Sequence, residues 1–267
     1  MSGGDMTATL RDCILGQAVA DALGVPYEFR ARDTFSCTDM VGFGSHHQPA
    51  GTWSDDTSMA LCICDSFREL GHIDVEDIRR RFVRWYREGA YTVDGLFDIG
   101  GACARALDQG YGCAGEWDNG NGSLMRTVPL AFTDATDDEV RAVSAITHAH
   151  PTSTGLCVSL VHIARTLARG VAPCDAIPDA GVLAARPRAE VRSSGFVRDT
   201  FEAALWCLLM TSTYADCVRA AVNLGDDTDT TAAVAGALAG IVYGANAIPA
   251  RWLAALRGRD VIEACLF

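Results

Sequence analysis

The chain has 267 residues, of which 49% are hydrophobic and 21% are charged, and its formal net charge at pH 7 is −12. This balance is typical of a globular protein with a large core, and it excludes a disordered chain. The excess of negative charge, without a row of lysines and arginines, excludes a protein that binds nucleic acid through a basic patch.

Membrane and export signals are not visible in the sequence. No apolar stretch reaches the roughly 18 residues that a transmembrane helix needs, and the first dozen residues hold no basic segment followed by an apolar one. The eleven cysteines are odd in number, and several lie in apolar helical patterns, where a thiol packs as a small core residue. We therefore expect a cytoplasmic monomer without membrane contact, folded as a single domain over residues 1–267.

The first expected element is a buried helix. Apolar residues recur every four positions from Leu10 to Ala22, and small residues do the same from Gly16 to Gly24. This pattern predicts a helix that packs closely against a neighbour and ends near Gly24. Glu28 follows on the exit loop, where an acid is ordinarily solvated and where a functional role is the alternative.

Residues 30–49 lack periodicity, and we expect them to form a loop that is either a lid over a site or a mobile segment. Residues 51–57 follow this loop. Ser54, Asp55 and Asp56 stand next to one another directly before an apolar helical run. Because neighbouring side chains point in different directions on a regular helix or strand, we expect these carboxylates on an irregular turn. Two interpretations stay open: the segment caps the helix start, or its oxygens bind a metal ion.

Helical patterns continue along most of the remaining chain. Expected helices cover residues 59–70, 75–87, 95–109, 137–149 and 153–169, and two more begin near Phe201 and Asp216. No strand-like alternation of useful length occurs in the sequence. We therefore expect an all-α fold.

Two polar segments interrupt these helices. Asn121, Gly122 and Ser123 lie on a glycine-containing turn that opens the next helix, and they either bind a diphosphate through backbone N–H groups or form a tight helix connection. His148 lies near the end of the helix expected over residues 137–149, where a capping role is the simpler interpretation.

A second acidic cluster begins the last long helix. Asp227, Asp229 and Thr230 precede an apolar run, residues 232–244, that has no polar face and carries glycines four positions apart. Such a helix must be buried, so its polar start lies inside the molecule, where the aspartates need cations or protons. Capping accounts for one aspartate only. Carboxylate and hydroxyl oxygens favour Mg²⁺ or Mn²⁺, and two facing clusters would supply enough charge for two ions.

Five motifs in this order resemble the ADP-ribosylglycohydrolase family. They are Gly16-x-x-x-Ala20-Asp21-Ala22-Leu23-Gly24-x-Pro26-x-Glu28, Trp53-Ser54-Asp55-Asp56-Thr57, Gly120-Asn121-Gly122-Ser123-x-Met125-Arg126, Thr147-His148 and Gly225-x-Asp227-Thr228-Asp229-Thr230. The resemblance implies an all-α, compact orthogonal helical bundle with two divalent cations, magnesium or manganese, in a cleft that receives ADP-ribose. Family members cleave the N- or O-glycosidic bond at the distal ribose.

The resemblance also implies a role for each matching residue. Metal ligands would be Ser54, Asp55 and Asp56 for one ion and Asp227 and Thr230 for the other, with Asp229 as a bridge. Glu28 would transfer a proton or orient the substrate, and Asp56 is the other candidate for proton transfer. Substrate contacts would come from Asn121, Gly122, Ser123 and His148.

Three residues depart from the family pattern, and none of them removes a ligand. Ser54 stands where threonine is commoner, Ala20 where glycine is frequent, and Asp226 where glycine is usual. Asp226 would either tune metal affinity or face solvent.

The activity that the resemblance implies is the release of ADP-ribose from a modified protein or another ADP-ribose conjugate, with arginine as the first choice of attached residue. ADP-ribosyl-serine and O-acetyl-ADP-ribose are the alternative substrates. Two further alternatives are a phosphohydrolase that cleaves the diphosphate and a binding protein without turnover.

Overall fold

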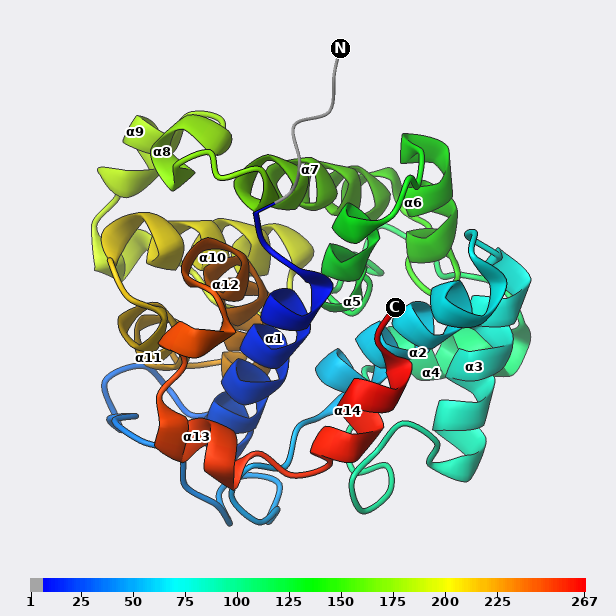
Figure 1. Ribbon diagram of the computed structural model, residues 1–267, viewed down its shortest axis with the longest axis horizontal. Coiled ribbons are helices and arrows are strands. Elements are labelled where there is room, and N and C mark those ends of the chain that lie inside the picture. Colours follow the sequence, from blue (N-terminus) through cyan, green and yellow to red (C-terminus); the bar gives the residue numbers. More distant parts are fainter. Residues whose placement is uncertain (1–6) are drawn as a thin grey trace.

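The computed structural model describes residues 7–267 as helices joined by loops (Figure 1). Its α-helices are α1 (Leu10–Gly24), α2 (Asp55–Leu70), α3 (Val75–Glu88), α4 (Gly101–Gln109), α5 (Leu124–Thr127), α6 (Asp137–Ala145), α7 (Pro151–Ala168), α8 (Pro173–Ala176), α9 (Ala180–Ala184), α10 (Val197–Met210), α11 (Tyr214–Val222), α12 (Thr228–Tyr243), α13 (Ala250–Ala255) and α14 (Arg259–Cys265). Short 3-10 helices are η1 (Val25–Tyr27), η2 (Val128–Phe132), η3 (Arg188–Glu190) and η4 (Ala245–Ala247).

Strand pairing within residues 7–267 is limited to two isolated bridges, one between Cys113 and His148 and one between Gly120 and Phe196. The expected all-α fold is therefore confirmed. Residues 1–6 belong to the expected domain over residues 1–267 and lie outside the described residues.

Helices α1 and α12 share the most extensive contact in the molecule, and both are buried along almost their whole length. They approach so closely that a β-carbon added at Gly16 would lie 2.3 Å from the carbonyl oxygen of Gly236. Glycine is the residue that leaves room for a backbone at this distance, so these glycines set the spacing of the two helices. The expected close packing of the first helix through its small residues is confirmed.

This pairing also joins the two helix ends that carry acidic residues. Thr228 Oγ1, at the start of α12, donates a hydrogen bond of 2.9 Å to the carbonyl oxygen of Gly24, at the end of α1. A β-carbon added at Gly24 would lie 2.4 Å from the α-carbon of Asp229. The exit loop of α1, which carries Glu28, therefore begins beside the first turn of α12.

Gly236→Ala is expected to lower the free energy of unfolding by about 3 kcal/mol, because the added methyl group forces two packed helices apart. It would lie 2.3 Å from Ala20 Cβ and 2.5 Å from the carbonyl oxygen of Gly16. Gly181→Ala in α9 is the matched control, since a β-carbon there meets no atom within 4 Å. Urea unfolding of both variants measures the difference, and a Gly236→Ala variant as stable as the wild type would contradict this packing.

Helix α4 begins later than expected, at Gly101 instead of near Gly95. Gly95 has a φ of +100° and Gly100 is extended, so the backbone leaves helical geometry at both positions. The residues between them form a loop that the helical pattern did not predict. Asp98 lies on this loop.

Helix α6 ends earlier than expected, at Ala145 instead of Ala149. The backbone that would have continued it pairs with Cys113, whose N–H donates to the carbonyl oxygen of Thr147 and whose carbonyl oxygen accepts the N–H of Ala149, each at 2.8 Å. Pro151 then opens α7, where a missing N–H costs no intrahelical hydrogen bond.

The cysteines pack as the helical patterns predicted. All eleven are free, and every one except Cys174 is buried. No helix within residues 7–267 combines the length and the hydropathy that crossing a membrane requires.

Candidate functional site

The two acidic clusters meet where the first turns of α2 and α12 face each other. Thr230 Oγ1 lies 3.4 Å from Asp56 Oδ2 and donates a hydrogen bond to it across a sequence separation of 174 residues. Carboxylate oxygens of Asp21, Asp56 and Asp229 all lie within 4.8 Å of one another. Acids from three separate helices thus share one buried position.

Ser54 caps α2, and both acids that follow it are helical. Its Oγ accepts the N–H of Asp56 at 3.3 Å, and α2 begins at Asp55. The expectation of an irregular turn is therefore wrong, because a helix start exposes N–H groups that a serine cap and acidic first-turn residues satisfy. Ser54 thus caps the helix, while the carboxylate of Asp56 lies close to those of Asp21 and Asp229 from other helices.

Asp21 of α1 orients this helix start. It is fully buried and accepts hydrogen bonds from the N–H of Ser54 at 3.0 Å, the N–H of Thr57 at 3.1 Å and Thr57 Oγ1 at 2.6 Å. Burial raises the pKa of Asp21 to about 7 against the opposing effect of these donors. The sequence placed Asp21 in a motif, but its position inside an apolar helix did not indicate this contact.

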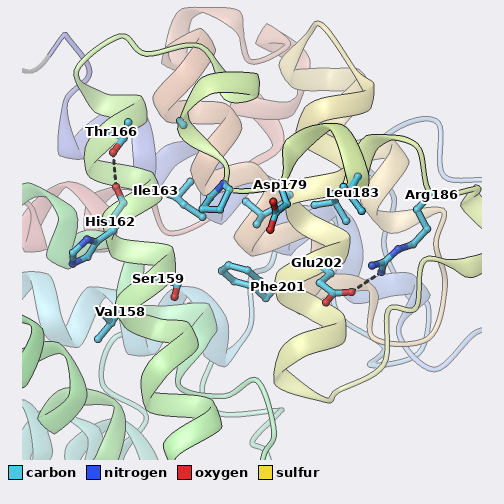
Figure 2. A pocket seen from close by; sticks show the side chains of 14 residues that line it. Val158, Ser159, His162, Ile163, Thr166, Asp179, Leu183, Arg186, Phe201 and Glu202 are labelled. Atoms are coloured by element: carbon cyan, nitrogen blue, oxygen red, sulfur yellow. Dashed lines mark hydrogen bonds and ion pairs between the residues drawn. The ribbon is translucent and has the colours of Figure 1, made fainter.

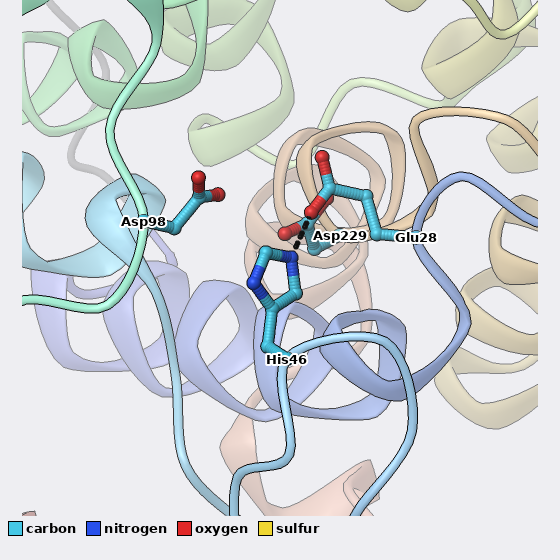
Figure 3. A group of neighbouring side chains, drawn as sticks. All are labelled: Glu28, His46, Asp98 and Asp229. Atoms are coloured by element: carbon cyan, nitrogen blue, oxygen red, sulfur yellow. Dashed lines mark hydrogen bonds and ion pairs between the residues drawn. The ribbon is translucent and has the colours of Figure 1, made fainter.

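A second group of ionisable side chains (Figure 3) shares Asp229 with the first. Ligand atoms of Glu28, His46, Asp98 and Asp229 lie within 4.8 Å of one another, and His46 Nε2 is hydrogen-bonded to Glu28 Oε2. His46 comes from the loop over residues 30–49, so this loop reaches the acidic centre. Glu28 is buried and not solvated.

His46 and Asp98 are site residues whose position the sequence analysis missed. His46 lies on the aperiodic loop over residues 30–49, and Asp98 fell inside a segment expected to be helical. Neither residue has a local signal, because each reaches the centre through the path of a long loop.

The aspartates of both clusters are costly to ionise. Burial, followed by the charges of neighbouring carboxylates, raises the pKa of Asp55, Asp56 and Asp229 well above the ordinary value. Burial also raises the pKa of Asp227 and of Glu28, while the hydrogen bond from His46 opposes the shift of Glu28. The group needs protons or cations to be stable at neutral pH.

Three carboxylate oxygens at this centre have no hydrogen-bond partner although they are buried: Asp56 Oδ1, Asp227 Oδ1 and Asp229 Oδ2. Unpaired buried oxygens of this kind are rare unless an ion or water binds them. Hard divalent cations take carboxylate and hydroxyl oxygens as ligands, so the residues present fit such an ion.

Asn121 binds the second acidic cluster directly. Its Nδ2 donates to Asp227 Oδ2 at 2.8 Å and to Thr200 Oγ1 at 2.8 Å. The side-chain amide therefore fixes the orientation of Asp227 and lies beside the candidate metal site.

Ser123 and His148 lie beneath the glycine-containing turn. Ser123 is fully buried and accepts a hydrogen bond of 3.0 Å from Ser144 Oγ. His148 is also buried, and a β-carbon added at Gly122 would lie 2.9 Å from its Cε1 atom. Burial lowers the pKa of His148 to about 3, so the imidazole is neutral. Both side chains support the turn from inside the protein.

Asp226 faces solvent and has a φ of +64°, a conformation that favours glycine. Its backbone joins the exit loop of α1 to the loop before α12. The N–H of Phe29 donates to the carbonyl oxygen of Asp226 at 2.7 Å, and the N–H of Asp226 donates to the carbonyl oxygen of Arg30 at 2.8 Å. Of the two alternatives for this residue, the structure supports the solvent-facing one.

A cavity of about 580 Å³ lies on another side of the molecule, between α7, the α8–α9 segment and α10 (Figure 2). Phe201 and Leu183 form part of its apolar lining, and an ion pair of 2.5 Å between Arg186 and Glu202 lies at one end. None of the predicted site residues lines this cavity, so it is separate from the acidic centre.

Comparisons with known proteins agree with the geometry. A family model described as ADP-ribosylglycohydrolase matches residues 5–266. The chain is 38% identical to the ADP-ribosylarginine hydrolase Tri1 of Pseudomonas putida (strain GB-1), over 91% of this chain and 72% of that protein. It is 32% identical to the ADP-ribosyl-[dinitrogen reductase] glycohydrolase of Rhodospirillum rubrum, over 96% of this chain and 92% of that protein. A solved structure described as an ADP-ribosylglycohydrolase-related protein complex matches with a TM-score of 0.79 at 32% identity, covering 96% of this chain and 94% of that chain.

Proposed function

This chain belongs to the ADP-ribosylglycohydrolase family, and on that premise we propose that it hydrolyses the glycosidic bond between ADP-ribose and an arginine side chain of a modified protein. The observation that carries the proposal is that two clusters of acidic side chains share Asp229, in a chain whose relative is named an ADP-ribosylarginine hydrolase. Product analysis tests it: the protein should release free ADP-ribose from an ADP-ribosyl-arginine peptide.

We further propose two divalent cations, Mg²⁺ or Mn²⁺, at the acidic centre. Ser54, Asp55 and Asp56 would bind one ion, Asp227 and Thr230 the other, and Asp229 would bridge them. The unpaired oxygens of Asp56, Asp227 and Asp229 support this assignment. Paired cations of this kind bind the oxygens of a substrate and lower the pKa of a bound water.

Other residues near the proposed cations would position the ligands and bind the substrate. Asp21 holds the first turn of α2 in place, and Asn121 does the same for Asp227. The backbone of Asn121, Gly122 and Ser123 would wrap the diphosphate and ribose, with the neutral ring of His148 packed behind the turn.

Glu28 is the preferred group for moving a proton at the glycosidic bond, with Asp56 as the second candidate. Burial raises the pKa of Glu28 toward the range in which a carboxyl group can both give and take a proton. The hydrogen bond from His46 opposes this rise in pKa, and the neighbouring carboxylates of Asp98 and Asp227 add to it.

Glu28→Gln is expected to lower kcat by about 10²–10⁴-fold, because an amide of the same shape cannot transfer the proton. The variant should still bind the metal, as measured by calorimetry, because the proposed ligands are unchanged. A variant with undiminished kcat would remove Glu28 from the mechanism.

The same substrate panel tests the alternatives. Turnover of ADP-ribosyl-serine peptides or O-acetyl-ADP-ribose in preference to the arginine peptide would reassign the linkage. AMP and ribose phosphate as products would indicate a phosphohydrolase, and an unchanged bound ligand would indicate a binding protein. The single domain over residues 1–267, the monomeric state and the cytoplasmic compartment stay predictions.

A further inference from the structure

Phe29 is an exposed aromatic residue held in an uncommon backbone conformation next to Glu28. Its exposed fraction is 73%, and its φ is +64°, in the left-handed region that bulky side chains rarely adopt. The hydrogen bond from its N–H to Asp226 holds the backbone there. Strain of this kind persists where the surrounding structure enforces it and is concentrated at functional sites.

The ring of Phe29 belongs to a row of three rings at the edge of the acidic centre. Its centroid lies 5.9 Å from that of His46, and the centroid of His46 lies 5.4 Å from that of Phe97. His46 stands between Glu28 and Asp98 (Figure 3), so the row runs past both carboxylates. Phe97 precedes Asp98 directly in the chain. We call Phe29, His46 and Phe97 the aromatic row.

We propose that the aromatic row is the wall of a subsite for a planar cation, the guanidinium group of the arginine from which ADP-ribose is released. This inference rests on the proposed function and names the residues that select its leaving group. A guanidinium is flat and weakly hydrated, so it stacks on aromatic faces and pairs with carboxylates at the same time. The row supplies the faces, and Glu28 and Asp98 supply the carboxylates.

Charge supports a cation at this position. Glu28 and Asp98 lie outside the proposed ligand set, so their carboxylates stay available to pair with a cation beside His46. The alternative leaving groups, a serine hydroxyl and an acetate, carry no positive charge. They would form no ion pair with the carboxylates and no cation–π contact with the rings.

Phe43 provides a matched control for Phe29. It lies on the loop over residues 30–49, its exposed fraction is 71%, and its φ is +61°. Within residues 7–267 its ring stacks on no other aromatic ring. Replacing Phe43 thus removes the same side chain from the same kind of backbone position outside the aromatic row.

Steady-state kinetics of the metal-loaded protein on an ADP-ribosyl-arginine peptide test the inference. Phe29→Ala is expected to raise KM by roughly fivefold with kcat nearly unchanged, which is the effect of one partly exposed cation–π contact. Phe29→Tyr should restore the KM of the wild type, and Phe43→Ala should not alter it. Equal KM values for Phe29→Ala and the wild type would overturn the inference and leave the proposed function intact.

Binding of methylguanidinium separates the two proposals when turnover is absent. NMR titration of the metal-loaded wild type should shift the signals of the aromatic row, and Phe29→Ala should weaken binding by a similar factor. A wild type that hydrolyses no arginine peptide would overturn the proposed function. In that case methylguanidinium binding that depends on Phe29 would support the cation subsite, and binding that ignores Phe29 would overturn it.

Discussion

Asp229→Asn is expected to lower kcat/KM for the release of ADP-ribose by at least about 10³-fold and to raise the thermal stability of the metal-free protein. Within the described residues, Asp229 is the acid shared by both carboxylate groups, so its charge acts on Glu28 and Asp98 as well as on Asp21 and Asp56. Asparagine keeps the shape, removes one negative charge and is a weaker ligand for a hard cation.

The rise in stability follows from the burial of the charge. Burial and neighbouring acids raise the pKa of Asp229, which means that its ionised form is unfavourable in the folded protein. Thermal unfolding in a chelator measures this effect, and kinetics with added Mg²⁺ or Mn²⁺ measure the loss of activity. Asp226→Asn is the control, because Asp226 lies on the loop that leads directly into α12 but faces solvent. Full activity of Asp229→Asn would contradict the proposed metal centre.

In a chelator, the free energy of unfolding is expected to fall as the pH rises from about 4 to about 8. Burial raises the pKa of Asp21 to about 7 and that of Asp55 and Asp56 well above the ordinary value. Such acids keep their protons in the folded chain at pH values where the unfolded chain has lost them. The folded chain therefore binds more protons than the unfolded chain. This contribution to stability is complete at pH values below the pKa of the acids in the unfolded chain, and it is lost as the pH rises through their pKa in the folded chain.

Saturating Mg²⁺ or Mn²⁺ is expected to oppose this loss. At an ion concentration about 1,000 times Kd, binding adds about 4 kcal/mol, which corresponds to a rise of roughly 10 °C in Tm near pH 8. Thermal unfolding at several pH values, with chelator and with metal, measures both effects. Asp229→Asn should flatten the pH dependence in chelator. Stability that increases with pH in chelator would contradict the electrostatic description of the centre.

The motifs contained three acids that the structure brings together, Asp21, Asp56 and Asp229. The apolar run after Thr230 has no polar face, so burial of the start of α12 followed from its sequence. Ser54 and Asp56 stood at the start of another buried helix, and a hydrogen bond from Thr230 to Asp56 now joins the two segments. The pairing of the clusters was thus foreseeable from two separate helix patterns.

The positions of the loop residues could not be predicted in the same way. His46 and Asp98 joined the centre without any local signal, and Asp98 was expected inside a helix. Ser123 and His148 stood in motifs that implied substrate contact, yet their side chains are buried under the turn that they support. A motif identifies a residue type at a position, but the direction of its side chain depends on what packs around it.

The sequence by itself determined the all-α class, the buried pair of helices and the acidic composition of the centre. Helical periodicity and the size of Gly16 and Gly236 act locally or between regular elements, so their effects can be predicted from residue patterns. The tertiary structure alone decided that Glu28, His46 and Asp98 would meet beside Asp229. The paths of long loops depend on many weak contacts between distant residues, and no short pattern encodes them.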